Sequence, residues 1–547
     1  ANTTLTSTGS GAITFGNTLN GAYTLAVNTS GATTFTGAVG NSAALTSLTT
    51  DAGGSVAING GVVNTTGEQI YNDVATLGAA TTLTSTGSGA ITFGNTLDGA
   101  QALAVNTSGA TTFTGAVGGT TALTSITTDA GGSVNVNGGV VNTTGAQIYG
   151  EAATLGANTT LNSSGAGDIT FGNTLNGAYT LAVNTSGATT FTGAVGSSAA
   201  LTSLTTDAGG TVAINGGVVN TTGVQSYGEP ATLGANTTLI STATGAITFA
   251  DTLNGAYSLA VNTSGATTFT GAVGDVTPLT SLTTDALGTV AINGGAVTTT
   301  GAQTYGEAMT LGADASFSSM AAGDISFGSS VDTHSSALMA KSLTVNTSGV
   351  TRFQGAVGAQ SPLSRVITDA GGSVLLHAGN VTTTGNQTYG DAVVLEGDTR
   401  LNTTQGTVEF VSITDAGAGY NLTLLSATPQ TLADIQVGGT LNVTTQAGGV
   451  TQQVGTHLET GGLATFTANV GTQQVADLTS ADNRFGIGLP ATDVNLKLTQ
   501  TNGGSWGNVS VTTNSALNLG DLQSAGTVTL DTRGALTTHS ISTSNDL

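Results

Sequence analysis

Four histidines and a recurring aspartate are the residues of this sequence whose types could support catalysis or metal binding. The histidines, His334, His377, His457 and His539, lie 43 or more residues apart, so no two of them share a motif. Catalytic and zinc sites bring several such groups together. We therefore expect no catalytic, metal-binding or cofactor-binding residue among them.

The aspartate belongs to the phrase TDAGG or a close variant of it. It recurs at Asp51, Asp129, Asp207, Asp285 and Asp369, with a relative at Asp415. Calcium needs six to eight oxygens that converge on one point. One carboxylate per repeat, about 19 Å from the next, cannot supply them. We expect a corner aspartate that accepts hydrogen bonds from its own backbone, and no bound cofactor.

These residues are positioned by a long internal repeat. Residues 27–40 read VNTSGATTFTGAVG, and the same words return at 105–118, 183–196 and 261–274, each copy 78 residues after the last. A fifth copy, VNTSGVTRFQGAVG at 345–358, follows 84 residues later because six residues are inserted before it. Repetition at a fixed period is the primary indication of a repeat architecture.

Each 78-residue unit holds four related phrases, which in the first unit span 6–16, 27–37, 49–60 and 63–73. Each passes from small polar residues through glycine into a short alternating segment. The alternating pairs are Ile13/Phe15, Thr33/Phe35, Val56/Ile58 and Gln69/Tyr71. Alternation with period two among Thr, Val, Ile and Phe predicts half-buried β-strands. Helix-forming residues are scarce and glycine is frequent, which argues against helices.

Four phrases in 78 residues predict a parallel β-helix, or β-solenoid, with about 20 residues per coil. We expect residues 1–400 to form five repeat units of 78–84 residues and residues 401–547 to continue as diverged coils. Phe35, Phe113, Phe191 and Phe269 should then occupy equivalent inward positions. One observation does not fit identical coils: glycines 11, 31, 54, 67 and 89 are spaced by 20, 23, 13 and 22 residues.

A chain of sandwich domains of about 78 residues is the alternative fold. It predicts antiparallel strands and a large buried aromatic residue in each unit, yet the one tryptophan, Trp506, lies outside the repeats. Within the solenoid, the inserted stretch 331–342 predicts a corner loop that projects from the coils. Residues 481–493 predict a second loop or a wider corner.

Composition excludes several classes of partner. Charged residues are 7% of the chain, the formal net charge is −23, and residues 1–340 contain no lysine or arginine. Nucleic-acid binding and adsorption to anionic membranes both need clustered cations, so neither is expected. Cysteine is absent, which rules out disulfides and thiolate metal sites. No apolar run reaches the length of a membrane-spanning helix, so we expect no membrane insertion.

The phrases at 11–40 and 48–67 resemble the repeats of filamentous-haemagglutinin-like proteins, which are large bacterial surface adhesins exported by two-partner or autotransporter routes. The resemblance is close over residues 1–400 and looser beyond. It implies a right-handed parallel β-helix shaft and an exported, extracellular or outer-membrane-associated location. It also implies a non-enzymatic adhesin that meets a host, bacterial or abiotic surface. A self-assembling fibre, sheath or matrix protein, whose partner is a further copy of itself, is the alternative function. The opening residues ANTTL match 157–161 inside a repeat, so we expect that residue 1 is not a natural start.

Overall fold

The structure is a computed structural model that describes residues 1–377, 379–469, 475–501 and 505–543. In this part of the chain every regular element is a β-strand. The strands wind into a parallel β-solenoid of about 24 turns with about 22 residues per turn. The chain divides into two compact units, Ala1–Gly271 and Ala272–Leu547, and we describe each by itself.

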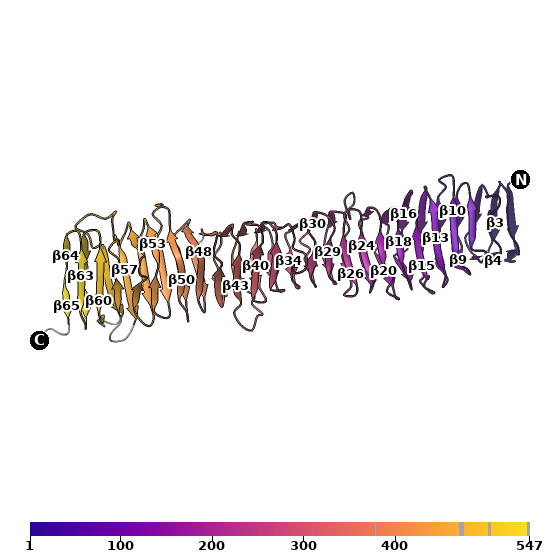
Figure 1. The fold of residues 1–547 in the computed structure, drawn as a ribbon. Coiled ribbons are helices and arrows are strands. Elements are labelled where there is room, and N and C mark those ends of the chain that lie inside the picture. The colour runs from indigo at the N-terminus through magenta and orange to yellow at the C-terminus, as the bar shows by residue number, and fades with distance from the viewer. Residues whose placement is uncertain (378, 470–474, 502–504, 544–547) are drawn as a thin grey trace. The chain divides into compact units, whose positions relative to one another are not determined.

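In the first unit, strands of successive turns lie side by side in rows (Figure 1). The strands of this unit are β1 Thr3–Ser7, β2 Ile13–Phe15, β3 Thr24–Thr29, β4 Ala32–Phe35, β5 Ser47–Thr50, β6 Ser55–Ile58, β7 Val62–Thr65, β8 Gln69–Tyr71, β9 Val74–Leu77, β10 Thr81–Ser85, β11 Ile91–Phe93, β12 Leu97–Asp98, β13 Ala102–Thr107, β14 Ala110–Phe113, β15 Ser125–Thr128, β16 Ser133–Val136, β17 Val140–Thr143, β18 Gln147–Tyr149, β19 Ala152–Leu155, β20 Thr159–Ser163, β21 Ile169–Phe171, β22 Leu175–Asn176, β23 Thr180–Thr185, β24 Ala188–Phe191, β25 Ser203–Thr206, β26 Thr211–Ile214, β27 Val218–Thr221, β28 Gln225–Tyr227, β29 Ala231–Leu233, β30 Thr237–Ser241, β31 Ile247–Phe249, β32 Leu253–Asn254, β33 Ser258–Thr263 and β34 Ala266–Phe269.

Each turn of the first unit has three strand positions, so a strand pairs with the third position after it. β10 pairs with β13, and β11 pairs with β14, both in parallel. β12 reaches its partner through the isolated bridge between Leu97 and Val117, and Val117 in turn bridges to Val141. Parallel pairing confirms the predicted solenoid and rules out the sandwich, whose neighbouring strands would run in opposite directions.

One 78-residue repeat does not fill a whole number of turns. The repeat that starts at Thr81 holds the ten strands β10–β19 and the bridge position at Val117, which makes eleven positions. At three positions per turn this is three and two-thirds turns, not the four that the four phrases suggested. Equivalent residues of successive repeats therefore lie on different faces. The row that starts at Leu5 in β1 reaches Leu239 in β30 after eleven turns, whereas Leu83 and Leu161 lie in the other two rows.

This mismatch explains the uneven glycine spacing. Glycines 31 and 54 stack in turn on Gly11 and Gly31 at one corner, while Gly89 stacks on Gly67 at another, so the step of 13 residues passes between corners. The stacked glycines leave no room for side chains. A Cβ on Gly89 would lie 2.1 Å from the carbonyl carbon of Gly67, so only glycine allows the turns to approach this closely.

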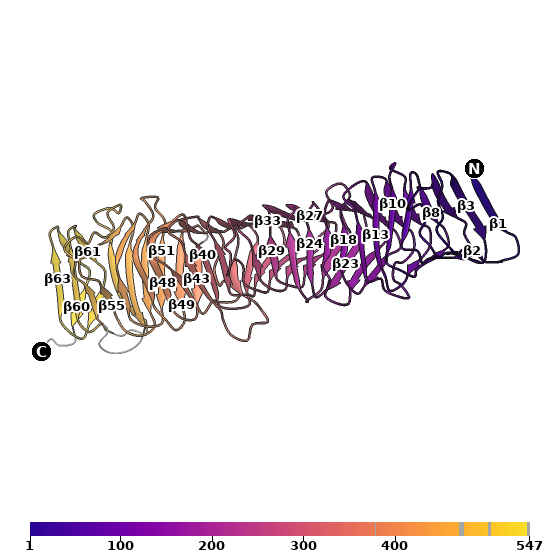
Figure 2. The same cartoon turned by 45° about the vertical axis from the view of Figure 1, so that its right-hand side comes forward.

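Alternate residues of each strand point into the core. Phe35, Phe113, Phe191 and Phe269 are all buried, as the sequence predicted. Their rings stack on those of neighbouring turns: Phe113 lies 5.7 Å from Phe93, between ring centroids, with the two rings nearly parallel. Small, β-branched and aromatic side chains in thin layers thus replace a single large core. Figure 2 shows the short strands of successive turns on which these layers are built.

A buried polar network recurs beside the aromatic stack. In the second repeat, the Tyr149 hydroxyl donates to Gln147 Oε1 at 3.0 Å. Gln147 Nε2 donates to the Val141 and Asn162 carbonyls and to the Thr143 hydroxyl, at 2.9–3.2 Å. The carbonyl of Asn162 belongs to the following turn, so the glutamine ties two turns together. The equivalent glutamines have the same partners, and they are Gln69, Gln225, Gln303 and Gln387.

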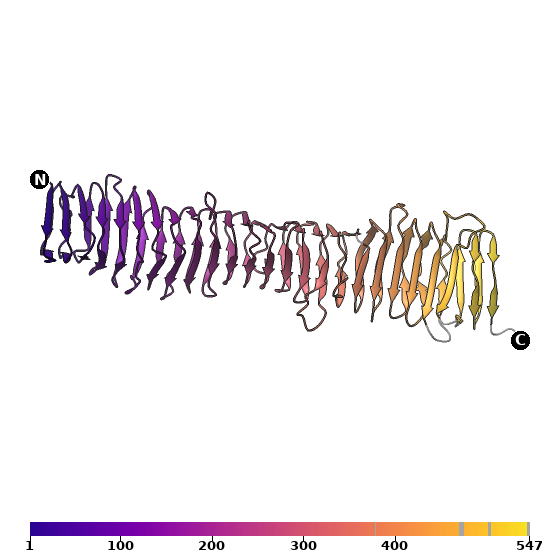
Figure 3. The same cartoon turned by 180° about the vertical axis from the view of Figure 1, so that it is seen from behind.

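The second unit continues the same construction (Figure 3). Its strands are β35 Ser281–Thr284, β36 Thr289–Ile292, β37 Ala296–Thr299, β38 Gln303–Tyr305, β39 Ala308–Leu311, β40 Ala315–Ser319, β41 Ile325–Phe327, β42 Val331–Thr333, β43 Ser342–Asn346, β44 Val350–Phe353, β45 Arg365–Thr368, β46 Ser373–Leu376, β47 Asn380–Thr383, β48 Gln387–Leu395, β49 Thr399–Thr403, β50 Val408–Thr414, β51 Leu422–Ser426, β52 Gln430–Leu432, β53 Asp434–Val437, β54 Leu441–Thr445, β55 Val450–Gln452, β56 Leu458–Thr460, β57 Ala464–Asn469, β58 Ala476–Leu478, β59 Leu496–Thr501, β60 Val509–Thr513, β61 Leu517–Leu519, β62 Leu522–Ser524, β63 Val528–Thr532, β64 Leu536–Thr538 and β65 Ile541–Thr543.

The insertion at 331–342 is only partly a loop. Residues 331–333 form β42, which pairs with β39, and the projecting loop is the stretch between Thr333 and Ser342 (Figure 1). Leu338 and Met339 in this loop are 100% and 75% exposed. Residues 481–493 contain no strand, as predicted, and the diverged stretches after residue 400 do form paired strands. Residues 470–474 of one such stretch lie outside the described residues.

Candidate functional site

A second carboxylate stacks on the recurring aspartate of each repeat. Asp129 follows β15, and the register pairs Thr128 with Tyr149 in the next turn. Two residues after Tyr149 the chain carries Glu151, so an acidic residue stands over the TDAGG corner. We call the TDAGG aspartate the lower member of each acidic pair and the acidic residue of the following turn the upper member. The upper members are Asp73, Glu151, Glu229, Glu307 and Asp391, each at most 3% exposed. The sequence predicted one isolated carboxylate per repeat, and that prediction was wrong.

The first repeat shows what an aspartate does at the upper position. The lower corner has four residues between its paired strands, 51–54, and the upper corner has only two, 72–73. The extra backbone amide of Gly54 therefore has no carbonyl opposite it. Asp73 Oδ1 accepts that N–H at 2.8 Å, and Asp391 accepts the N–H of Gly372 at 2.7 Å in the same way.

The lower aspartate does not bond its own backbone, contrary to the sequence expectation. Asp51 Oδ1 accepts the N–H of Thr29 at 2.8 Å, and Thr29 belongs to the preceding turn. Asp369 accepts the N–H of Thr347 at 3.0 Å in the fifth repeat. Asp415 does fit the expectation, since its carboxylate accepts N–H groups of Gly417 and Gly419 in its own loop, both at 2.8 Å.

A glutamate at the upper position leaves oxygens without partners. In the second repeat, the Thr128 hydroxyl is hydrogen-bonded to the Glu151 carboxylate, while Asp129 Oδ1 is buried and has no hydrogen-bond partner. In the third repeat the Thr206 hydroxyl donates to Glu229 Oε2, while Asp207 Oδ1 and Glu229 Oε1 have none. Burial raises the pKa of Glu229 to about 7 and also raises the pKa of Glu151, because both are removed from water beside another carboxylate.

The fifth repeat carries a different group of side chains on one face. The four preceding repeats place threonine at the position of Arg352, asparagine at that of His377 and glycine at that of Glu396. The three replacements come together although 44 residues separate the first from the last. Arg352 Nη1 donates to the two Glu396 oxygens at 3.0 and 2.8 Å, and His377 Nδ1 lies 3.9 Å from Glu396 Oε2.

These residues line an open hollow of about 710 Å³. The loop after β50 forms one wall of it, with Ala416, Ala418 and Tyr420. Asp415, which is 2% exposed, holds this wall by accepting the N–H groups of Tyr420 at 2.8 Å and of Gly438 in the next turn at 2.9 Å. The hollow thus combines a guanidinium, an imidazole, a carboxylate and an aromatic ring on a fixed backbone.

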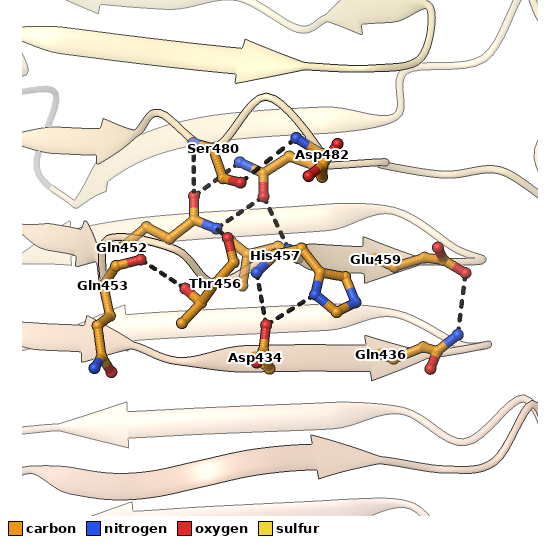
Figure 4. A network of polar contacts seen from close by, with 11 residues as sticks. Asp434, Gln436, Gln452, Gln453, Thr456, His457, Glu459, Ser480 and Asp482 are labelled. Atoms are coloured by element: carbon orange, nitrogen blue, oxygen red, sulfur yellow. Dashed lines mark hydrogen bonds and ion pairs between the residues drawn. The ribbon is translucent and has the colours of Figure 1, made fainter.

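A polar network surrounds His457 in the second unit (Figure 4). His457 Nδ1 lies 2.8 Å from Asp434 Oδ1, which also accepts the His457 backbone N–H at 2.7 Å. Gln452 and Asn483 exchange two side-chain hydrogen bonds of 2.8 and 2.9 Å, and Asn483 Oδ1 accepts the N–H of Leu458. Asn483 is completely buried, so the network fixes the loop that follows β58 against β55 and β56.

The histidines are not brought together. His334 contacts Ser336 at 2.8 Å, and His539 contacts the Leu519 carbonyl at 3.4 Å. His377 and His457 each have a carboxylate partner about one turn away in sequence, which no local motif reveals. Within the described residues, no three His, Cys, Asp or Glu side chains are grouped as metal ligands.

None of the described residues belongs to a helix long and apolar enough to cross a membrane.

Neither a family model, nor a curated protein, nor a solved structure matches this chain.

Proposed function

We propose that this chain is the shaft of an exported, non-enzymatic adhesin that presents binding surfaces away from a bacterial cell. The observation that supports it is the stacking of the turns. Each turn adds about 4.8 Å along the axis, so about 22 residues extend the solenoid by that distance without a globular core. The resemblance of residues 1–400 to filamentous-haemagglutinin-like repeats supports an outer-membrane-associated or released location.

The hollow of the fifth repeat is the surface that we propose for contact with the partner. Most outward positions of the repeats carry Thr, Asn, Ser or Ala, which offer little binding energy. The hollow instead gathers Arg352, His377 and Tyr420, and arginine and tyrosine are enriched where proteins bind one another. Its residues depart together from the pattern of the other repeats, which is expected where a surface has a task of its own.

Reversion to the repeat pattern tests this proposal. The variant Arg352→Thr, His377→Asn, Glu396→Gly restores the residues of the other repeats, so it should fold. We expect the purified variant to lose at least ten-fold in its ability to block adhesion of the producing bacterium to host cells, other bacteria and abiotic surfaces. Thr112→Ser, Thr154→Ser, Thr232→Ser, also on outward positions, is the matched control. Equal blocking by all three proteins on every surface would contradict the assignment of this face.

A self-assembling fibre is the second candidate, and the low charge of the first unit favours it. Residues 1–271 have no lysine or arginine, and their outward strand positions are mostly small and polar. Such faces pack closely side by side with little charge repulsion. Negative-stain microscopy of native material separates the two functions: isolated shafts support the adhesin, and long regular polymers support the fibre.

A further inference from the structure

The charged side chains of the fifth-repeat hollow come from three successive turns of one row. β44 pairs with β46 and β46 pairs with β48, and the register places Arg352, Leu375 and Val394 side by side. His377 and Glu396 each follow the last paired residue of their strand. The Arg352 side chain therefore spans two turns, or about 10 Å, to reach Glu396. This contact holds the guanidinium against the sheet.

The ion pair uses only part of the guanidinium. Arg352 Nη1 donates to both oxygens of Glu396, at 3.0 and 2.8 Å. Among the described residues, none accepts a hydrogen bond from Nη2 or Nε of Arg352. A guanidinium carries its N–H groups in one rigid plane, and two adjacent groups fit the two oxygens of a carboxylate. The edge formed by Nε and Nη2 is thus a prepared carboxylate-binding fork.

Two further donors line the same hollow. His377 is 61% exposed in its side chain, and its Nδ1 lies 3.9 Å from Glu396, too far for a hydrogen bond. The Tyr420 hydroxyl has no partner among the described residues. Asp415 also lines the hollow, but its oxygens already accept four backbone N–H groups. Two basic side chains and a hydroxyl therefore share one available carboxylate.

The surroundings of the hollow limit what can bind there. The net charge of −23 repels polyanions, so an isolated carboxylate is favoured over an acidic polymer. β44, β46 and β48 each pair with a strand on both sides, so a peptide cannot add to this sheet as another strand. Recognition must therefore come through side chains.

We propose that the hollow binds one carboxylate of a protein partner, from an aspartate or glutamate side chain on its surface. The Nε and Nη2 edge of Arg352 holds this carboxylate, and His377 and the Tyr420 hydroxyl are further donors. The inference rests on the proposed function, because it takes the hollow as the contact surface. A histidine gains a proton in mildly acidic solution, which strengthens the contact. The titratable or charged groups that line the hollow with His377 are Arg352, Glu396, Asp415 and Tyr420.

A pair of peptides tests the ligand class on the whole chain. The first is acetyl-Gly-Gly-Glu-Gly-Gly-amide, and the second has glutamine in place of glutamate. Saturation-transfer NMR titrations at pH 5.5 and pH 8 give the two affinities. We expect the glutamate peptide to bind, and the glutamine peptide to bind about ten-fold more weakly. The glutamate peptide should bind about three-fold more tightly at pH 5.5, and His377→Asn should remove this difference.

Glu396→Gln gives the sharpest test, because it removes the carboxylate that competes for Arg352. Peptide affinity should rise about three-fold in this variant. If Glu396 instead held the partner, the affinity would fall. Arg352→Lys keeps the charge without the planar fork, should lower the affinity about five-fold, and serves if Glu396→Gln fails to fold. Arg400→Lys is the matched control, since Arg400 lies on β49 in another row and should leave the affinity unchanged.

Three results would overturn the proposal: equal binding of the two peptides, weaker binding by folded Glu396→Gln, or binding of tri-galacturonate but not of the glutamate peptide. The adhesion assay separates this failure from failure of the proposed function. If the glutamate peptide does not bind while the triple reversion variant still loses blocking, the ligand class is wrong and the proposed function stands. If the peptide binds while the reversion variant blocks like the wild type, the proposed function fails and the carboxylate site stands.

Discussion

The buried tyrosines of the repeats are among the largest side chains in the core, and each hydroxyl donates to the glutamine two residues before it. Burial raises the pKa of these phenols far above the ordinary value near 10, because the charged form would lose its hydration. Since the folded state holds these protons and the unfolded state releases them above pH 10, the free energy of unfolding must fall as the pH rises through that range.

We predict alkaline destabilisation with a slope of about 1.4 kcal/mol per pH unit for each buried phenol. Urea unfolding of the chain at pH 9, 10 and 11 should show it. Tyr149→Phe removes one titrating group and should lower the slope above pH 10 by one proton, while losing one buried hydrogen bond at every pH. Tyr257→Phe is the control, since Tyr257 is 39% exposed, and should leave the slope unchanged. Equal slopes for Tyr149→Phe and the wild type would contradict the prediction.

At the scale of the strand, the aromatic residues join neighbouring turns through their stacked rings. Tyr71, Phe93 and Phe113 form one continuous stack through three turns, with centroid distances of 5.1 and 5.7 Å. A cavity at Phe113 would therefore remove contacts from the turns on either side of it. The damage should remain local, because each turn contacts only its neighbours.

We predict that Phe113→Ala destabilises the surrounding turns by about 3–5 kcal/mol, the usual cost of removing a buried phenyl ring. Limited proteolysis should then cut near residue 113, while distant repeats stay resistant. Thr112→Ala, which changes the adjacent outward side chain, should cause no new cleavage. If the protease cuts the whole chain at once, the repeats unfold as a single unit and the expectation of local damage is wrong.

The strands were predictable from sequence because alternation states which side chains point inward. The alternating pairs Thr33/Phe35 and Gln69/Tyr71, and their equivalents in the other repeats, each predict two inward-facing side chains of one strand. The number of turns per repeat was not predictable, since Val39 and Leu19 occupy strand positions through single bridges that leave no alternating pattern. The acidic pairs were missed for a related reason: whether Glu151 stands over Asp129 depends on two corners of unequal length, which only the pairing register reveals.

At the scale of the unit, equivalent strands of successive repeats lie in different rows, so all three rows are built from the same set of strands. Every row receives each of the eleven positions of the repeat in turn, so a position has no fixed face. Throughout the first unit, each strand position nevertheless pairs with the third position after it in the sequence. Removing one whole repeat therefore leaves every strand with a neighbour of the type it had before.

We predict that deletion of residues 83–160, one complete repeat, gives a folded protein. Its β-sheet signal per residue in circular dichroism and its thermal midpoint, within about 5 °C, should match the full chain. Deletion of residues 83–121, half a repeat, joins unlike positions and should yield a protein that is partly unfolded or aggregated. Indistinguishable behaviour of the two deletions would show that position type does not govern pairing.

The remainder of two-thirds of a turn also sets where copies of a surface feature point. Tyr23 and Tyr257 precede β3 and β33 in the same row, whereas Tyr179 precedes β23 in another. Gain or loss of one copy of the repeat within the first unit would move each later copy of such a feature to a different row of strands. Only changes in multiples of three copies would return each feature to its original row, so the copy number sets the face on which a feature lies as well as the number of turns.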